Sequence, residues 1–312
     1  MATTNVTEDE KQNFSETIQG LFCSVVIVST LHDQLTFIAI LNAFLSITAF
    51  LGNVLVLVAL RKDSSLHPPS KLLLCSLAIT DLCAGMFSEP LYVTLLVTVV
   101  NEHWNICRYV AVGFSVTGTI SISVSLLTLT AISVERLLAL LLGLRYRQVV
   151  TLKRTRFIII AFWVLSAGFT TILFFCKYHI TSMCGTIGTS LCLVTSIFSH
   201  TKIFFTLRRH QNQLQNHVQQ PNQTNQLNIA RFRKAVSMAL WLQFALIVCY
   251  LPLVISGNLF RKTEPFSSYV VALSYTFTLV FLNSSLNPIL YCWKIDGVRQ
   301  AMKETIRQLL CC

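Results

Sequence analysis

Seven long stretches of the chain are almost free of charged residues, and shorter polar segments separate them. The membrane spans predicted around these stretches cover residues 34–60, 71–99, 106–138, 156–176, 179–207, 230–259 and 266–292. Each is long enough to cross the roughly 30 Å hydrocarbon core of a bilayer as a helix, which satisfies its own backbone hydrogen bonds there. The pattern therefore predicts an all-α membrane protein whose seven-transmembrane helix bundle occupies residues 34–293.

Residues 1–33 precede this bundle. They contain an acidic segment, and their apolar run at 21–31 is too short to span a bilayer. We interpret the run as an interfacial or packed part of the N-terminal region.

Residues 294–312 follow the bundle and are amphipathic. Arg299, Lys303 and Arg307 recur every four residues, while apolar side chains share another face. This pattern predicts a short amphipathic helix on the cytoplasmic membrane surface, with a short tail. Acylation of Cys311 and Cys312 would add a second membrane anchor.

Basic residues predict how the chain is oriented in the membrane. Most of the 24 lysines and arginines lie in loops on one side of the seven spans. The positive-inside rule places that side in the cytoplasm and the N-terminus outside the cell. The sequons at Asn5 and Asn13 are then predicted glycosylation sites. The net charge of +11 comes mostly from these cytoplasmic lysines and arginines, which suit anionic membrane lipids and a protein partner. We therefore expect no nucleic-acid partner.

Composition excludes several classes of protein. The chain is 54% hydrophobic and 12% charged, whereas soluble domains carry about 25% charged residues. An ordinary cytoplasmic enzyme, a disordered regulator and a nucleic-acid-binding domain are therefore excluded. Most of the 11 cysteines lie in apolar runs, where they act as small hydrophobic residues. Cys23, Cys107, Cys176 and Cys184 lie where an oxidising compartment could pair them.

Short motifs then occur along the chain in a fixed order. They are Gly52-Asn53-Val54, Leu77-Ala78-Ile79-Thr80-Asp81, Trp104, Glu135-Arg136-Leu137, Trp163, Cys249-Tyr250-Leu251-Pro252 and Asn287-Pro288-Ile289-Leu290-Tyr291. In this order they resemble the rhodopsin-like (class A) G-protein-coupled receptors, over about residues 34–312. Three features that most of the family has are missing here: a disulfide cysteine at the position of Ala111, a long second outer loop and a proline in the fifth span. In lacking them, the chain resembles the melanocortin, cannabinoid, lysophospholipid and adenosine receptors, and the melanocortin receptors most.

The resemblance implies an activation switch. In the family, the residue matching Glu135 holds the arginine matching Arg136 at rest and releases it toward a heterotrimeric G protein. The other switch residues implied are Tyr250, Pro252, Asn287, Pro288 and Tyr291. The alternatives are a snorkelling surface arginine at Arg136 and an interfacial aromatic at Tyr291. Residues 230–234 contain no acid that could also hold Arg136, which predicts high basal activity.

Asp81 is an isolated carboxylate in a membrane span, so it requires polar partners or water. The resemblance implies a sodium pocket formed by Asp81, Ser125, Asn283 and Asn287. An allosteric sodium ion is then the only cofactor that we expect. The alternative is a hydrogen-bonded cluster that packs helices together without an ion.

Two positions bear on the ligand. Gly118 occupies the place of the acid that monoamine receptors carry, and Phe281 that of the opsin lysine, so the ligand is predicted to be neither a monoamine nor retinal. A peptide, a lipid and another small molecule stay open. Glu89 is either a counter-ion for a basic ligand or a solvated helix end. For the outer face we expect a disulfide between Cys107 and Cys184.

We therefore expect a multi-pass receptor of the plasma membrane that is not an enzyme. It would convert binding of an extracellular ligand into nucleotide exchange on a heterotrimeric G protein, with arrestin and membrane lipids as further partners. One alternative is a receptor homologue that does not signal, because several switch positions depart from the family pattern. The other is a membrane transporter, although the chain shows no internal repeat.

Overall fold

The computed structural model describes residues 22–23, 25–62, 66–175, 178–217, 241, 243–256, 266–294, 299–300 and 307. Regular secondary structure in these residues is helical throughout. The elements are α3 (Val25–Lys62), α4 (Pro68–Cys83), the π-helix η1 (Ala84–Ser88), α5 (Glu89–Val100), α6 (Trp104–Leu142), the 3₁₀-helix η2 (Gly143–Arg145), α7 (Tyr146–Val149), α8 (Leu152–Phe175), α9 (Tyr178–His217) and α12 (Phe266–Lys294).

Six helical stretches within the described residues are long and apolar enough to cross a membrane, and α4, η1 and α5 together form one of them. A shorter apolar helix, Gln243–Ile255, lies where the sixth span is predicted. The predicted all-α, seven-helix membrane bundle is therefore confirmed. Most of the predicted amphipathic segment lies outside the described residues, as do Asn5, Asn13, Cys311 and Cys312.

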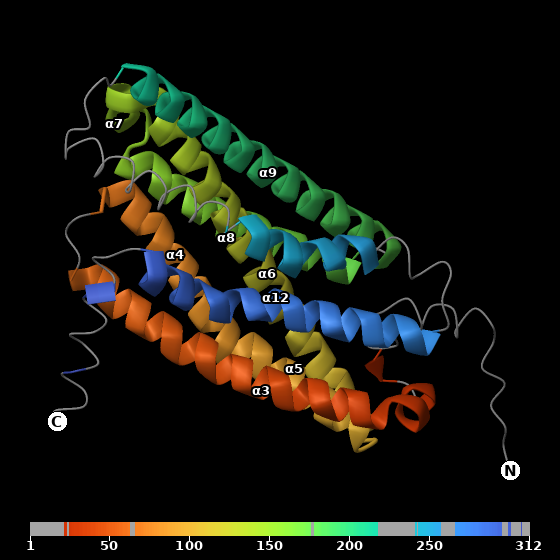
Figure 1. Ribbon diagram of the computed structural model, residues 1–312. Helices are drawn as coiled ribbons and strands as arrows, with labels where there is room; N and C mark the ends of the chain where they lie inside the picture. Colours follow the sequence, from red (N-terminus) through yellow and green to blue (C-terminus); the bar gives the residue numbers. More distant parts are fainter. Residues whose placement is uncertain are drawn as a thin grey trace, which may run out of the picture.

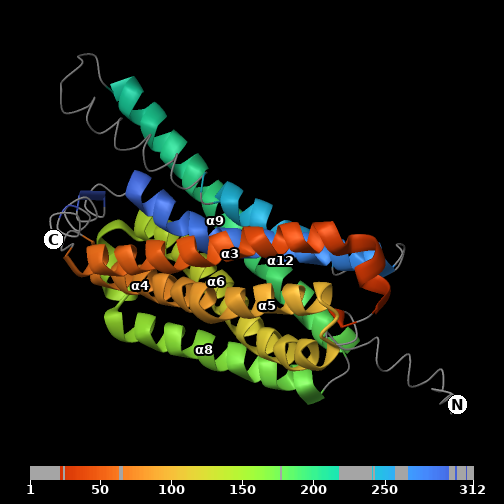
Figure 2. The same ribbon diagram turned by 90° about the horizontal axis from the view of Figure 1, so that it is seen from below.

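The helices run side by side along one common direction (Figure 1). α3 packs along α12 and α5, while α6 contacts α4 and α5 as well as α8 and α9. α6 therefore packs against helices in both halves of the bundle, and α4 also contacts α8. Figure 2 shows the last turns of α9 extending beyond the neighbouring helices.

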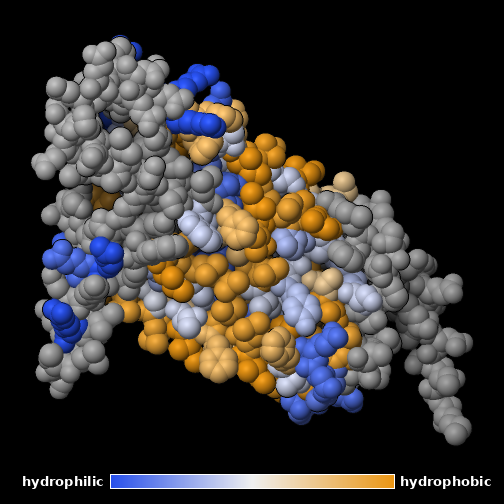
Figure 3. All heavy atoms as spheres, viewed as in Figure 1, coloured by the Kyte–Doolittle hydropathy of each residue, from blue (hydrophilic) through white to orange (hydrophobic). Residues whose placement is uncertain are grey.

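The bundle has its apolar side chains outside and many of its polar side chains inside. Phe44, Val164 and Leu191 are all more than 60% exposed, whereas Asn53 and Asp81 are fully buried. Figure 3 shows the resulting apolar surface on one side of the molecule. This distribution is the reverse of that in a soluble protein, and it suits a molecule surrounded by lipid, because polar groups then find partners only in the interior.

A π-helix interrupts the second span just before Pro90. Proline has no backbone N–H and its ring clashes with the carbonyl four residues earlier, so the helix widens at Ala84–Ser88. A Cβ atom at Gly85 would lie 2.9 Å from the backbone nitrogen of Phe50, so only glycine permits this contact with α3. Ser46 Oγ fixes the contact by donating a 2.7 Å hydrogen bond to the Gly85 carbonyl. After this turn, both Ser88 and Glu89 are buried.

Two helices are longer than the sequence pattern predicts. α3 begins at Val25, within the segment interpreted as N-terminal, because the residues from 25 to 33 include no proline or glycine that would end a helix. α9 continues to His217 and includes the first residues of a Gln- and Asn-rich segment that the sequence pattern presents as a linker.

Candidate functional sites

The acid–arginine pair lies near the end of α6 that leads into η2 and α7. Arg136 Nε is 3.5 Å from Glu135 Oε2, and the Arg136 side chain is 40% exposed while that of Glu135 is buried. The other carboxylate oxygen, Oε1, accepts a 2.5 Å hydrogen bond from Ser70 Oγ in α4 and a further one from the Tyr146 hydroxyl in α7. Glu135 is therefore held by three partners on three elements.

Tyr146 remains a hydrogen-bond donor to Glu135 at physiological pH. Burial raises the pKa of Tyr146 to about 12, and the hydrogen bond to Glu135 acts in the same direction. Neither Ser70 nor Tyr146 belongs to the predicted switch, because no local pattern in the sequence links them to Glu135.

A second polar cluster joins α6, α9 and the helix at residues 243–255. Ser133 Oγ lies 3.1 Å from both Ser196 Oγ and His200 Nε2, and Ser196 Oγ donates a 3.1 Å hydrogen bond to Gln243 Oε1. Ser133, Ser196 and His200 are all buried. His200 is therefore a hydrogen-bonded residue of the interior.

Asp81 lies at the centre of the bundle and is fully buried. Its carboxylate accepts hydrogen bonds from Asn287 Nδ2 at 2.7 Å, Ser284 Oγ at 2.8 Å and Ser125 Oγ at 3.3 Å. Three spans thus meet at one carboxylate. Asn283 is not among these donors, and its Nδ2 is buried without a partner in the described part of the chain.

The remaining predicted switch residues lie around this centre. Tyr250 is buried in a cluster with Leu126 and Leu246. Pro288 lies inside α12, where a Cβ atom on Gly52 of α3 would be only 2.9 Å from its Cγ atom. Pro252 lies in the helix at residues 243–255, and the side chain of Tyr291 is outside the described residues.

Glu89 is fully buried, which makes the solvated-helix-end interpretation wrong. Both of its carboxylate oxygens lack a hydrogen-bonding partner among the residues that the structure describes. Next to it in sequence, Ser88 Oγ is 3.0 Å from Ser121 Oγ of α6. The π-helix before Pro90 explains the burial, because it changes which side chains of the second span face inward.

An aromatic cluster fills the bundle near Gly118. Tyr92 and Phe114 are stacked with their ring centres 4.9 Å apart, and Phe277 and Phe281 of α12 pack against them. The Phe114 ring covers Gly118, because a Cβ atom there would lie 3.1 Å from Phe114 Cε2. The sequence alone gave these rings no role beyond packing, and the structure brings them together from three spans.

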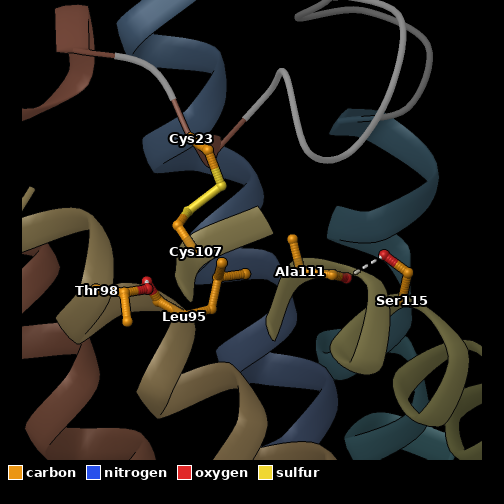
Figure 4. The surroundings of a disulfide bond; sticks show 6 residues. All are labelled: Cys23, Leu95, Thr98, Cys107, Ala111 and Ser115. Atoms are coloured by element: carbon orange, nitrogen blue, oxygen red, sulfur yellow. Dashed lines mark hydrogen bonds between the residues drawn. A yellow bond between two sulfur atoms is a disulfide. The ribbon is translucent and has the colours of Figure 1, made fainter. Parts of the chain in front are cut away.

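The disulfide prediction is wrong in its partner. Cys107 is bonded to Cys23, which ties the segment before α3 to the start of α6 (Figure 4). Cys184 is a free cysteine in α9 and lines a cavity together with Ile122 of α6. Ile122 lies about 22 Å along α6 from Cys107, so Cys184 is far from that cysteine. α8 ends at Phe175 and α9 begins at Tyr178, close to the predicted bounds of the fourth and fifth spans, so Cys184 is inside a span.

A bundle of membrane-spanning helices with a buried central carboxylate and an acid–arginine pair at the end of its third span is the arrangement of a G-protein-coupled receptor. In agreement, residues 52–183 match the family model for the 7 transmembrane receptor (rhodopsin family). Melanocortin receptor 5 of Rattus norvegicus is 27% identical over 282 residues, which cover 86% of this chain and 82% of the relative.

Two human receptors are similar to the same extent. Melanocortin receptor 5 of Homo sapiens is 26% identical over 286 residues, which cover 86% of this chain and 82% of the relative. Adenosine receptor A2b of Homo sapiens is 27% identical over 300 residues, which cover 84% of this chain and 87% of the relative. These matches support a rhodopsin-like (class A) G-protein-coupled receptor that is related to the melanocortin and adenosine receptors. It is a multi-pass receptor of the plasma membrane and not an enzyme.

Proposed function

We propose that this receptor converts binding of an extracellular ligand into nucleotide exchange on a heterotrimeric G protein. The observation that carries the proposal is the pair of Glu135 and Arg136, in which the arginine is 40% exposed and its 3.5 Å contact with the acid is long. A charge-assisted hydrogen bond is normally 2.7–2.9 Å, roughly. Arg136 is thus restrained only weakly and is accessible to a partner at this end of the bundle.

The test is nucleotide exchange on purified G proteins in the presence of the receptor in lipid vesicles. We expect Arg136→Ala to abolish exchange while the variant still reaches the cell surface. Arg108→Ala is the matched control, because Arg108 lies near the opposite end of the same helix. Unchanged exchange in Arg136→Ala would show that Arg136 does not act on the G protein, and it would favour a receptor homologue that does not signal.

We also propose that the N-terminus is extracellular. Arg61 and Lys62 end α3, on the side of the bundle that the positive-inside rule assigns to the cytoplasm. The disulfide between Cys23 and Cys107 lies at the opposite end, and disulfides persist in oxidising compartments. Charge and redox chemistry thus support the same orientation, which would place the sequons of Asn5 and Asn13 outside.

The residues around Asp81 fit a sodium ion, which we propose as the allosteric ligand of this receptor. Sodium is a hard cation that takes oxygen ligands, and the carboxylate of Asp81 and the hydroxyls of Ser125 and Ser284 offer them. Nearby, Asn53 Oδ1 is a buried oxygen without a partner in the described part of the chain. Bound sodium would supply a positive charge for the carboxylate and stabilise one packing of the helices.

For the ligand, we propose that Glu89 is the counter-ion of a cationic group. A buried carboxylate that no described residue satisfies is costly, and a positively charged ligand group would supply the missing partner. The aromatic rings of Tyr92 and Phe114 lie near Gly118, where three spans meet. These rings would contact the apolar part of such a ligand. Arrestin and membrane lipids stay among the proposed partners.

A further inference from the structure

A cavity of about 220 Å³ lies between α6, α8 and α9, away from Asp81, Glu89 and the acid–arginine pair. Ile122 and Leu126 of α6, Ser166 and Phe169 of α8, and Gly188 of α9 belong to its wall. No charged residue is among those that line it. The cavity therefore suits an uncharged, largely apolar occupant.

Two glycines of α9 create the hollow. A Cβ atom on Gly188 would have no other atom within 4 Å, and one on Gly185 would be 3.6 Å from Phe169 Cζ. Glycine in a helix interior costs about 1 kcal/mol relative to alanine. Because no close neighbour requires a glycine at position 188, its effect is to leave space beside α8.

The cavity opens toward lipid and extends from the middle of α6 to the first turns of the span that begins at Met183 in α9. Ile122 and Leu126 are near the middle of the span Trp104–Leu142. At the rim, Leu165 is 63% exposed and Cys184 is exposed. The occupant therefore enters from the bilayer, and a charged lipid headgroup would find no charged partner among the residues that line the cavity.

The wall also offers hydrogen-bonding groups. Ser166 is 3% exposed, and its Oγ has no partner within the described residues. Thr189 Oγ1 donates a 2.9 Å hydrogen bond to the Gly185 carbonyl, which leaves the oxygen free to accept another. In a bilayer core, an unsatisfied hydroxyl has no water with which to pair.

We propose that this cavity binds an uncharged lipophilic molecule with one hydroxyl group, taken up from the membrane. The hydroxyl bonds to Ser166, and the apolar body lies against Phe169, Leu126 and the surface of Gly188. The volume exceeds the roughly 150 Å³ of an apolar protein cavity that binds benzene and is below the roughly 300 Å³ of a drug-sized site. A short-chain or one-ring alcohol matches this size. The site does not depend on the proposed signalling function, because binding is measured directly.

The probe is a six-carbon alcohol that carries a photoreactive diazirine, added to the full-length receptor in lipid vesicles. After illumination, mass spectrometry maps the labelled residues. We expect saturable labelling of the wall residues on α6, α8 and α9, and suppression of this labelling by excess 1-octanol. Labelling that does not saturate and follows the lipid-exposed surface in general would overturn the proposal.

Two glycine variants make the test specific. Gly188→Leu fills the hollow and should remove the saturable labelling. Gly168→Leu is the matched control, because Gly168 also has no atom within 4 Å of a Cβ position but does not line the cavity. Equal labelling of both variants would contradict the site. Thermal unfolding of each variant shows whether it is folded.

The hydroxyl contact is tested by Ser166→Ala. Loss of one hydrogen bond should weaken binding of the alcohol about threefold to tenfold. A diazirine alkane of the same length has no hydroxyl, and it should label the parent receptor and Ser166→Ala equally. If the alcohol binds both proteins equally well, Ser166 is not the hydrogen-bonding partner and the proposal as stated is wrong.

Discussion

At the residue scale, Glu135 has more partners than an acid that only neutralises an arginine. One of its oxygens is occupied by Ser70 and Tyr146, and only the other faces Arg136, at 3.5 Å. The carboxylate therefore cannot form a close two-oxygen contact with the guanidinium. The hydroxyls of α4 and α7 compete with Arg136 for the same acid.

We expect Tyr146→Phe to lower ligand-free nucleotide exchange. Without the tyrosine hydroxyl, only Ser70 still donates to Oε1 of Glu135, so this oxygen can also accept from Arg136 and the resting pair becomes stronger. A change of about 1 kcal/mol in this pair would reduce the active fraction about fivefold. Tyr109→Phe is the control, because Tyr109 is 82% exposed and far along α6 from Glu135. Higher exchange in Tyr146→Phe would show that the hydroxyl itself supports the resting state.

Sodium binding at Asp81 can be measured without knowing the receptor's ligand. We expect a higher thermal unfolding temperature in sodium chloride than in choline chloride at equal ionic strength, because a bound ion stabilises the folded state. The gain is about 1 kcal/mol when sodium is present at about five times its Kd. Asp81→Asn should remove the difference, whereas Ser121→Ala, a buried hydroxyl elsewhere in α6, should retain it. Equal stability in both salts would favour a packing cluster without an ion.

The sequence identified the polar residues at the centre of the bundle but not all of their partners. Asp81 and Asn287 lie in motifs within single helices, Ser125 follows from the family resemblance, and the three meet in the structure. Ser70, Tyr146 and the Ser133–His200 cluster come from different elements and carry no motif. The disulfide was assigned incorrectly because the sequence does not show which of the four cysteines lie close together, and the partner of Cys107 is in the segment before α3, far from it along the chain.

At the element scale, hydropathy predicts the spans because lipid imposes one length and one kind of side chain on each. It does not predict where a helix continues outside the bilayer, as α3 does at Val25 and α9 does at His217. It also does not reveal the π-helix at Ala84–Ser88. A single widened turn leaves the composition of the span unchanged but alters which residues face inward, and Glu89 is the residue most affected.

We expect Glu89→Leu to stabilise the ligand-free receptor, because the exchange removes a buried carboxylate that no described residue satisfies. Replacement of buried charged groups by apolar ones of similar size stabilises proteins by about 1–4 kcal/mol in favourable cases. Thermal unfolding measures the effect. The same exchange at Glu135 should destabilise, since Ser70, Tyr146 and Arg136 would lose their common partner. Destabilisation by Glu89→Leu would mean that the carboxylate is already satisfied.

At the scale of the whole molecule, the disulfide connects the beginning of the chain to its third span. We expect Cys23→Ser to lower the free energy of unfolding by about 2–4 kcal/mol, because the bond closes a long loop in the unfolded chain. Cys184→Ser, at a free exposed cysteine, should leave stability unchanged. A reductant should lower the unfolding temperature of the parent receptor to that of Cys23→Ser. If Cys184→Ser lowered the free energy of unfolding and Cys23→Ser did not, the disulfide would instead join Cys107 and Cys184.

The same bond makes α3, α4, η1 and α5 parts of a covalent ring that closes at the first turn of α6. When the receptor is pulled from its two ends, force passes across the sulfur atoms and bypasses the residues between two cysteines that are 84 positions apart in the sequence. Those residues add no length to the stretched chain, a reduction of about 300 Å at roughly 3.3–3.6 Å per residue. The first two spans are therefore mechanically shielded, and only reduction allows them to be drawn out of the membrane one after the other.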